Sequence, residues 1–332
     1  MSSEPAATSR RVAVVGAGVA GLAAARLLAD RGHAVELFDK GRGPGGRLAT
    51  RRADGFAFDP GAQYFTIKDA RLDPFMRVWR DQILVAPRRG RFGVLEAGSF
   101  IEQPPSHPRW VAVPGMSGLA RQLAADLDVN LAVRIKEAKR DGAFWRLTDE
   151  GGGNRGLFDW LVVATPPDQA IPLLQDAPDL AARASAAVMD PCWAAMLGFD
   201  KPLELSFEGA AVAGSPLAWI ARNDSKPGRK PGESLVLHAN PAWSRANLEL
   251  TPDEVLPLML DALTEALGKS PGAPLYATAH RWRYAQVAKP CPGGPRFDAA
   301  FGAGICGDWT TGPRIEAAWV SGLTLARQML AA

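Results

Sequence analysis

A glycine-rich turn near the start of the chain constrains the fold more than any other feature. An apolar run over residues 12–15 is followed by three glycines in the G-x-G-x-x-G spacing, an Ala/Leu-rich helical pattern and a second apolar run that ends at Asp39. The glycines are Gly16, Gly18 and Gly21. This order of strand, glycine turn, helix, strand and closing acid is typical of dinucleotide-binding folds. The sequence therefore predicts a Rossmann-type α/β domain.

Each part of this turn has a physical role in binding a dinucleotide. Gly16 allows the tight turn, Gly18 lets the backbone come close to a pyrophosphate, and Gly21 permits close packing of the helix on the strand. The N-terminus of the helix attracts the phosphates. Asp39 lies at the spacing at which a carboxylate holds the ribose hydroxyls in such folds. The other candidate contacts in this segment are Ala17, Ala20 and Lys40.

The composition argues against several other classes of protein. The formal net charge is only +3 over 332 residues, which gives little support to nucleic-acid binding. Three widely separated cysteines predict neither a disulfide framework nor a zinc site, and no apolar run approaches the ~20 residues of a membrane span. We therefore expect a cytoplasmic protein with no bound metal, no nucleic-acid partner and no membrane association. Residues 1–9 are expected to form a disordered leader without a secretory signal.

A second glycine-rich segment, GRGPGGR, follows Asp39 and ends at Arg47. Its glycines, Gly46 among them, would let a loop pass close to a cofactor, and Arg47 could offer a fork of donors to a phosphate. Alone, the segment is equally consistent with a flexible loop that ends in a solvated arginine. An acidic strand end followed at this spacing by Gly-Gly-Arg resembles the FAD-binding fingerprint of the flavin amine oxidase superfamily. The resemblance implies that the dinucleotide is FAD, which we expect to be bound non-covalently.

The block FDPGAQYFT, which starts at Phe58, narrows the resemblance to the renalase family in its bacterial type. It is similar to the renalase segment that runs beside the flavin ring. Gln63, Tyr64 and Phe65 are therefore candidate cofactor contacts.

Later segments resemble renalase in the same order. They are the turn and helix that begin VAVPGMSG and the C-terminal ICGDWTTGPRIEAAWVSG. On this resemblance, Ile135 covers the adenine, while Gly307 and Asp308 meet the ribityl–pyrophosphate portion of FAD. Ile315 begins a final helix whose positive N-terminus would point at the flavin ring and raise its electron affinity.

The resemblance implies an α/β fold in which a Rossmann-type FAD-binding domain is interleaved with a mixed-sheet α+β substrate domain. This is the architecture of p-hydroxybenzoate hydroxylase and the amine oxidases. We expect the discontinuous FAD-binding domain to comprise residues 10–68, 111–167 and 281–332. The substrate domain would then comprise residues 69–110 and 168–280.

Hydrophobic periodicity predicts individual elements of these domains. The clearest helix is expected over residues 251–267, with Thr251 as N-cap, Glu254 completing a capping box and Gly268 at the far end. A shorter helix is expected around 74–82. Strands are expected at 130–135, 144–148, 160–164, 194–199, 217–221 and 234–239.

No Ser-His-Asp arrangement is evident, so the flavin would carry the hard chemical step. The candidate pocket residues are Gln63, Tyr64, His238, Trp282, Tyr284 and Arg314. His238 lies on an apolar strand, where a satisfied core histidine is the more common explanation and a donor to substrate is the alternative. Trp282 and Tyr284 could wall a flat pocket in which a planar ring stacks.

A basic loop leaves two interpretations open. Arg222, Lys226, Arg229 and Lys230 could meet the phosphates of a dinucleotide substrate, but the proline and glycine content of the loop favours a solvated loop. A basic turn at residues 88–91 is also expected to be solvated.

The renalase resemblance implies an oxidase that converts the 2- and 6-dihydronicotinamide isomers of NAD(P)H to NAD(P)+. Hydride would pass to flavin N5, and O2 would be reduced to hydrogen peroxide. The first alternative is an oxidase of an amine or another small metabolite. Against an amine, Arg314 occupies the position where amine oxidases place a cage tyrosine. The second alternative is a non-enzymatic protein that binds FAD or another nucleotide.

Overall fold

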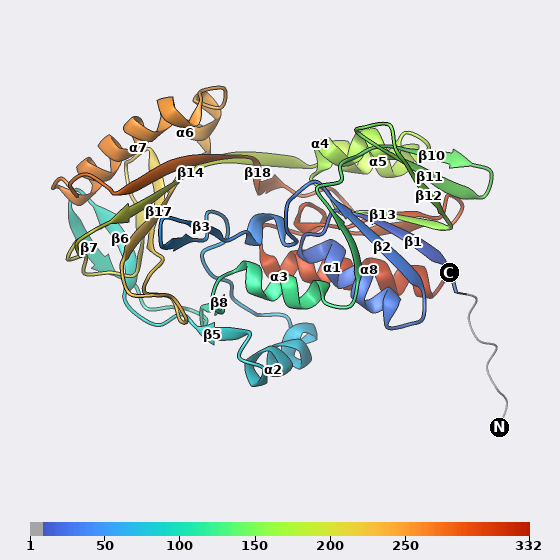
Figure 1. Ribbon diagram of the computed structural model, residues 1–332, viewed down its shortest axis with the longest axis horizontal. Coiled ribbons are helices and arrows are strands. Elements are labelled where there is room, and N and C mark those ends of the chain that lie inside the picture. Colours follow the sequence, from blue (N-terminus) through green and yellow to red (C-terminus); the bar gives the residue numbers. More distant parts are fainter. Residues whose placement is uncertain (1–8) are drawn as a thin grey trace. The chain divides into compact units, whose positions relative to one another are not determined.

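The computed structural model describes residues 9–332, which divide into two compact units (Figure 1). Unit 1 comprises the chain up to residue 46 together with 120–188 and 288–332, and unit 2 comprises 47–119 and 189–287. The predicted leader lies outside the described residues except for its last residue. This division follows contacts within each unit, and the functional domain bounds given above stay a prediction.

Unit 1 is built on a six-stranded sheet. Its strands are β1 (Arg11–Val15), β2 (Ala34–Asp39), β9 (Asp128–Leu131), β13 (Trp160–Val163), β19 (Arg296–Asp298) and β20 (Ala303–Ile305). Their order is β19-β20-β13-β1-β2-β9, and all neighbours are parallel except β19, which runs antiparallel at one edge. β1 lies inside the sheet and is buried after its first residue, as expected for a strand covered on both faces.

Two helices from opposite ends of the chain cover this sheet. α1 (Val19–Ala29) and α8 (Ile315–Leu330) lie side by side (Figure 1). Gly322 allows this close contact, because a Cβ there would overlap the carbonyl oxygen of Ala20.

The other elements of unit 1 include a small antiparallel sheet on the side of the large sheet away from α1 and α8 (Figure 1). Its strands are β10 (Ile135–Asp141), β11 (Phe144–Asp149) and β12 (Asn154–Phe158). The short helices are α4 (Pro167–Ala170), η3 (Ile171–Leu174), α5 (Pro178–Ser185) and η4 (Asp308–Thr310).

Unit 2 is built on a seven-stranded sheet. In spatial order its strands are β18 (Tyr276–Lys289), β14 (Val188–Phe199), β17 (Glu233–Ala239), β16 (Leu217–Arg222), β15 (Gly209–Val212), β6 (Phe92–Glu96) and β7 (Ser99–Glu102). Helix α7 (Pro252–Leu267) packs its apolar side, including Val255 and Leu263, on one face of this sheet. Leu235, Leu237 and Trp193 reach that core from the strands.

The opposite face of the same sheet carries a different set of side chains. Because side chains alternate along a strand, His238 and Val236 point away from the α7 core. Val236 there joins Phe58 and Met196 in a second, smaller apolar cluster. We call this side of the seven-stranded sheet the site face.

Smaller elements complete the structure. They are η1 (Gly46–Leu48), β3 (Arg51–Ala53), β4 (Phe56–Phe58), η2 (Ala70–Leu72), α2 (Asp73–Asp81), β5 (Val85–Pro87), β8 (Trp110–Ala112), α3 (Ser117–Ala124) and α6 (Pro241–Ala246). β3 pairs with β4, and β5 pairs with β8, both antiparallel.

Most of the predicted elements are confirmed. The capping box of α7 is present, since Thr251 accepts a hydrogen bond from the Glu254 amide and Glu254 accepts one from the Thr251 amide, and Gly268 ends the helix in the left-handed region. The single strand expected at 130–135 is wrong, because the chain turns between β9 and β10 with Ala132 at a positive φ. The strand expected at 194–199 extends back to Val188.

Candidate functional site

The glycine turn of unit 1 has the geometry that its sequence predicts. Gly16 has φ +107°, and a Cβ there would lie 2.9 Å from the carbonyl oxygen of Ala164. A Cβ at Gly21 would overlap the carbonyl oxygen of Gly16, which requires glycine where helix and strand meet. By contrast, a Cβ at Gly18 would meet no protein atom within 4 Å. The space beside Gly18, at the N-terminus of α1, is therefore open to a ligand.

The acidic end of β2 and the second glycine segment lie next to this turn. Asp39 accepts hydrogen bonds from the backbone amides of Ala17 and Gly41, both at 2.7 Å, so its carboxylate braces the loop as well as facing the predicted ribose site. The amide of Gly45 donates to the Ala17 carbonyl at 2.7 Å. Gly46, at φ +54°, is close enough for a Cβ to reach 3.9 Å from the Gly18 Cα. The two glycine segments thus form one backbone-lined cradle.

A surface pocket of about 710 Å³ opens beyond Asp39 in unit 1. Lys40 and Gly41 line one side of it, and Arg134, Asp149, Glu150 and Arg155 are among the residues on the other. Its arginines pair with its acids, Arg134 with Glu150 and Arg155 with Asp149. Lys40 donates to the amide oxygen of Gln169 at 3.0 Å. Ile135, next to Arg134 in sequence, is buried.

The C-terminal candidates of unit 1 lie between β20 and α8. Gly307 has φ +152°, and its amide donates to the Ser321 hydroxyl at 3.0 Å. Asp308 is buried and accepts from the Trp309 amide at 3.0 Å. Ile315 is the first residue of α8, as predicted, and Arg314 is the exposed residue before it.

In unit 2, the segment that follows β4 is held against Arg47 and the site face. The carbonyl of Arg47 accepts from the Ala62 amide at 3.0 Å, and a Cβ at Gly61 would overlap that carbonyl. The Arg47 guanidinium donates to the carbonyl of Ala285 at 2.9 Å. Phe65 is buried and exchanges two backbone hydrogen bonds with Trp110. These contacts give the segment from Gly61 to Phe65 one defined path.

Gln63 has its amide group fully engaged within the protein. Its Nε2 donates to the carbonyls of Asp59 and Gly61, and its Oε1 accepts from Lys226 at 3.1 Å and from Asn223 at 3.3 Å. A side-chain amide has two donor hydrogens and two acceptor lone pairs, and all four are used here. Gln63 is therefore arranged to shape the segment, and it has no side-chain hydrogen bond left for a ligand.

Asp59 is the centre of a buried charge cluster that sequence reasoning did not identify. Lys226 Nζ lies 2.9 Å and Arg229 Nη2 2.5 Å from the same carboxylate oxygen, and all three side chains are at least 95% buried. The other carboxylate oxygen accepts from the Thr50 hydroxyl at 2.7 Å and from the Met116 amide at 3.2 Å. We call Asp59, Lys226 and Arg229 the buried triad.

The electrostatics of the buried triad follow from its burial. Burial alone would raise the pKa of Asp59, but Lys226 and Arg229 outweigh it, so the pKa is below its ordinary value and Asp59 is ionised. Burial lowers the pKa of Lys226 to about 8, although Asp59 acts in the opposite direction. Lys226 therefore stays mostly charged near neutral pH, because Asp59 counters part of the effect of burial.

The buried triad corrects the interpretation of the basic loop. The expectation of a solvated loop is wrong for Lys226 and Arg229, which are buried against Asp59. It is also wrong for Arg88, whose guanidinium is 3% exposed and donates to the carbonyl and hydroxyl of Ser225. The sequence held one signal for this cluster. Asp59 lies directly before Pro60-Gly61 inside an apolar block, and a charged residue in such a block needs a buried partner.

The carbonyl of Pro60 is the point at which this segment meets the site face. His238 Nε2 donates to it at 2.9 Å, and Trp282 Nε1 donates to it at 3.0 Å. Both candidate pocket residues therefore use a ring N–H to hold the segment. The prediction that His238 is a satisfied core histidine is supported by this contact.

His238 should make the stability of the protein depend on pH. Burial lowers its pKa from 6.5 to about 4. As the pH falls below 6.5, the unfolded chain takes up this proton before the folded protein does, so the free energy of unfolding declines between pH 6.5 and 4, by up to about 3 kcal/mol. His238→Gln keeps an N–H donor for Pro60 and should flatten this slope in urea unfolding curves. Equal slopes for variant and wild type would contradict the assignment.

Aromatic side chains gather on unit 2 around Tyr64. Its ring centroid lies 5.9 Å from that of Trp219 and 6.3 Å from that of Phe92. A second pair joins Trp282 to His280 at 4.4 Å, edge to face. Tyr284, two residues further along β18 than Trp282, is half-buried. These residues supply flat apolar surfaces of the kind on which planar rings stack.

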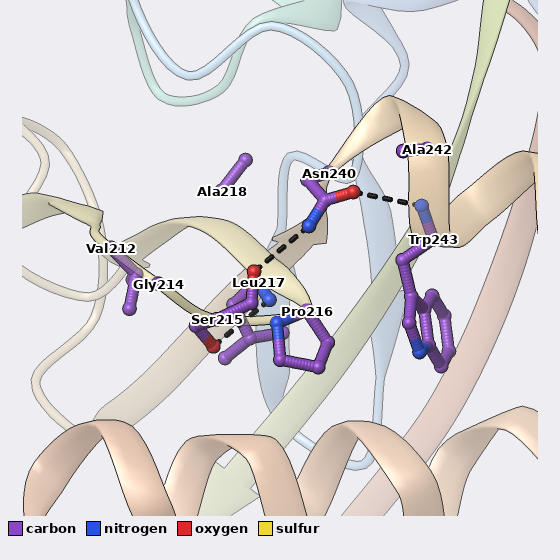
Figure 2. Close-up of a pocket in the computed structure, with 9 residues that line it drawn as sticks. All are labelled: Val212, Gly214, Ser215, Pro216, Leu217, Ala218, Asn240, Ala242 and Trp243. Carbon is purple, nitrogen blue, oxygen red and sulfur yellow. Dashed lines mark hydrogen bonds between the residues drawn. The ribbon is translucent and has the colours of Figure 1, made fainter.

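The open pocket of unit 2 in Figure 2 has no side chain that could act as an acid or a base. It measures about 710 Å³, and Trp243 and Leu217 in its lining also contact the α7 core. Asn240 uses its side chain within the pocket, accepting from the Trp243 amide and donating to the Ser215 carbonyl, both at 2.8 Å (Figure 2). None of the nine lining residues is titratable.

Two family models match the chain. A model described as NAD(P)-binding Rossmann-like domain matches residues 14–80, and one described as flavin containing amine oxidoreductase matches residues 90–330. The chain belongs to the flavin-containing amine oxidoreductase family. That family is one of flavin-containing oxidoreductases.

Individual relatives match in sequence over a short stretch and in fold over the whole chain. The chain is 45% identical over 65 residues to 4,4′-diapophytoene desaturase (4,4′-diaponeurosporene-forming) of Staphylococcus aureus strain Newman, which covers 20% of this chain and 13% of that relative. A structure assigned as a protoporphyrinogen oxidase from Exiguobacterium sp. 255-15 is similar with a TM-score of 0.78 at 16% identity, covering 98% and 100% of the two chains. Wild-type putrescine oxidase bound to putrescine has a TM-score of 0.72 at 13% identity, covering 98% and 99%.

The glycine cradle of unit 1 fits FAD. The open side of Gly18, the first-turn amides of α1 and the approach of Gly46 provide backbone contacts of the kind that a pyrophosphate needs. The pocket beyond Asp39 offers room for the adenosine end. In the described part of the chain, no helix is both long and apolar enough to cross a membrane.

Proposed function

We propose that the protein is an FAD-dependent oxidase of renalase type. It would oxidise the 2- and 6-dihydronicotinamide isomers of NAD(P)H to NAD(P)+, with O2 reduced to hydrogen peroxide. The observation that carries this proposal is the character of the site face. That face presents neighbouring aromatic rings and a neutral histidine whose ring N–H donates to the Pro60 carbonyl. A dihydropyridine gains aromaticity when it loses hydride, so its oxidation needs no strong protein base.

The residues of the chain would divide the work of such a reaction between binding and orientation. The glycine cradle and Asp39 would hold the pyrophosphate and ribose of FAD, which when bound supplies the two-electron acceptor. The N-terminus of α8, at Ile315, would place its positive dipole end toward the flavin. Gln63 and the buried triad would keep the segment from Asp59 to Tyr64 in place. Tyr64 and Trp282 would orient the nicotinamide ring by stacking.

The first alternative is an oxidase of an amine or another small metabolite. The family description and the fold of putrescine oxidase favour it. Against it, the position that amine oxidases give to a cage tyrosine is Arg314 here, and a cation poorly suits a second positive group. For that reason, an isomeric dihydronicotinamide is the preferred substrate class and an amine is the alternative.

One experiment separates the two substrate classes. Oxidised protein is mixed anaerobically with 2- or 6-dihydroNAD(P), with ordinary NAD(P)H and with a panel of amines that includes putrescine. The reduced flavin loses its absorption band at ~450 nm, which is a property of the cofactor. We expect the isomers to bleach this band rapidly and ordinary NAD(P)H to bleach it far more slowly. Fast bleaching by amines alone would overturn the proposal in favour of the alternative.

We also propose a cytoplasmic location with no nucleic-acid or membrane partner. Cys192, Cys291 and Cys306 are all free and buried, which suits a reducing compartment. The substrate would then be a soluble nucleotide, and O2 the second substrate.

A further inference from the structure

The guanidinium of Arg109, in unit 2, lies against aromatic rings and has no acidic partner in the described chain. It lies 4.2 Å from the ring centroid of Phe92 and 5.3 Å from that of Tyr64. Within residues 9–332, no carboxylate or hydrogen-bond acceptor engages this side chain. The residue is half-buried, so a solute can reach it. Its donors are therefore partly shielded from water and still unused.

Two nearby arginines that also contact aromatic rings differ from Arg109. Arg88 also lies over Phe92, at 5.7 Å, but it is buried and donates to Ser225 and to the Arg222 carbonyl. Arg91 lies 5.3 Å from the Phe100 ring and forms an ion pair with Glu102 at 2.8 Å. Both therefore have protein partners.

Two further aromatic contacts define the surroundings of Arg109. Phe92 and Trp219 are nearly parallel, with centroids 6.5 Å apart and an interplanar angle of 20°. Gly209 makes this arrangement possible, because a Cβ there would lie 2.7 Å from Trp219 and 2.9 Å from Phe92. The indole N–H of Trp219 has no hydrogen-bond partner in the described chain. Two near-parallel rings, a buried indole N–H without a partner and a guanidinium without a hydrogen-bond acceptor thus lie together in the described chain.

We infer that Arg109 binds an anionic oxygen group of the substrate, and that this group is a phosphate of the nicotinamide nucleotide. The inference rests on the proposed function, because the dihydronicotinamide substrate supplies the phosphate. A guanidinium presents a planar fork of N–H donors that matches a phosphate in two-point contact. The contacts with Phe92 and Tyr64 fix the orientation of that fork before substrate arrives.

The kinetic test compares substrates that differ only in phosphate. The substrates are the 6-dihydro forms of nicotinamide riboside, nicotinamide mononucleotide and NAD. They carry no phosphate, one phosphate and two phosphates, respectively. In Arg109→Met we expect KM for the mononucleotide and for NAD to rise about 10- to 100-fold, with kcat and the riboside nearly unchanged. Arg109→Lys keeps the charge and should recover part of the loss.

Arg91→Met is the matched control, because it removes an arginine that contacts an aromatic ring but is paired with Glu102. It should leave all three KM values unchanged. Equal losses for the riboside and the mononucleotide in Arg109→Met would overturn the inference, since a packing defect would not distinguish a phosphate.

A binding measurement keeps this inference separate from the proposed function. Calorimetric titration of the oxidised holoprotein with nicotinamide mononucleotide requires no turnover. Binding to the wild type that is lost in Arg109→Met supports the inference even if no isomer bleaches the flavin. Equal binding by wild type and Arg109→Met overturns it even if the isomers are good substrates.

Discussion

Asp59→Asn is expected to lower the free energy of unfolding by about 3–5 kcal/mol, a large effect for one substitution that preserves shape. The change removes the only carboxylate between Lys226 and Arg229 in the buried triad. Two buried cations would then face each other without a counter-charge, and Lys226 would be driven to lose its proton. The asparagine amide would also present donors to groups that now donate to Asp59, namely Thr50 and Met116.

Lys226→Met gives a contrasting result that isolates the charge. It leaves Asp59 paired with Arg229, so the expected loss is smaller, about 1–3 kcal/mol for the hydrogen bonds that Lys226 no longer donates to Gln63 and Asn223. The double variant Asp59→Asn with Lys226→Met should be more stable than Asp59→Asn alone, because it removes one of the two opposed cations.

These variants are compared by urea unfolding of the FAD-saturated protein at pH 7. Asp141→Asn is the matched control, since Asp141 pairs with Arg146 at an exposed site where such pairs contribute less than about 1 kcal/mol. A double variant less stable than Asp59→Asn would show that packing, and not charge, dominates the site.

Gly18→Val is expected to weaken FAD binding by about 10- to 100-fold while leaving the fold of the apoprotein intact. Gly18 has extended backbone angles that valine also adopts, and its Cβ direction meets no protein atom within 4 Å. The new methyl groups would instead occupy the space assigned to the pyrophosphate. Flavin content after purification and fluorescence titration of the apoprotein with FAD measure the effect, and thermal unfolding of the apoprotein measures the fold.

Gly232→Val provides the control for an open glycine elsewhere. A Cβ at Gly232 also meets nothing within 4 Å, and the residue belongs to unit 2, whereas the glycine cradle belongs to unit 1. It should bind FAD as the wild type does. If Gly18→Val retains wild-type FAD affinity, the pyrophosphate does not pass Gly18 and the assignment of the cradle fails.

Features with local causes could be predicted from the sequence. The capping box of α7 and the strand–turn–helix around Gly16 depend on residues close together in the chain, so their spacing was sufficient. The division between β9 and β10 was missed because the chain turns there with Ala132 at positive φ. Alanine rarely adopts positive φ, so its presence does not predict such a turn.

The candidate site was predicted less completely, because its contacts are distant in sequence. Lys226 and Asp59 are 167 residues apart in sequence. A lysine in a proline- and glycine-rich loop is expected to be solvated unless its buried partner is known. The same separation hid the buried contacts of Gln63, whose side-chain amide oxygen accepts hydrogen bonds from Lys226 and Asn223. The cation of Arg109 gave no sequence signal at all.

The contact of α1 with α8 has a consequence for how the protein is made. α1 directly follows β1, but α8, the helix that packs on it, comes after both segments of unit 2 in the chain. Because domains fold as units during synthesis, unit 1 must wait with an apolar helix uncovered while all of unit 2 is translated. Unit 2 also spans two segments, 47–119 and 189–287, but is complete before residues 288–332 appear. The glycine fingerprint is thus made before unit 2, and the helix that completes its domain is made after unit 2.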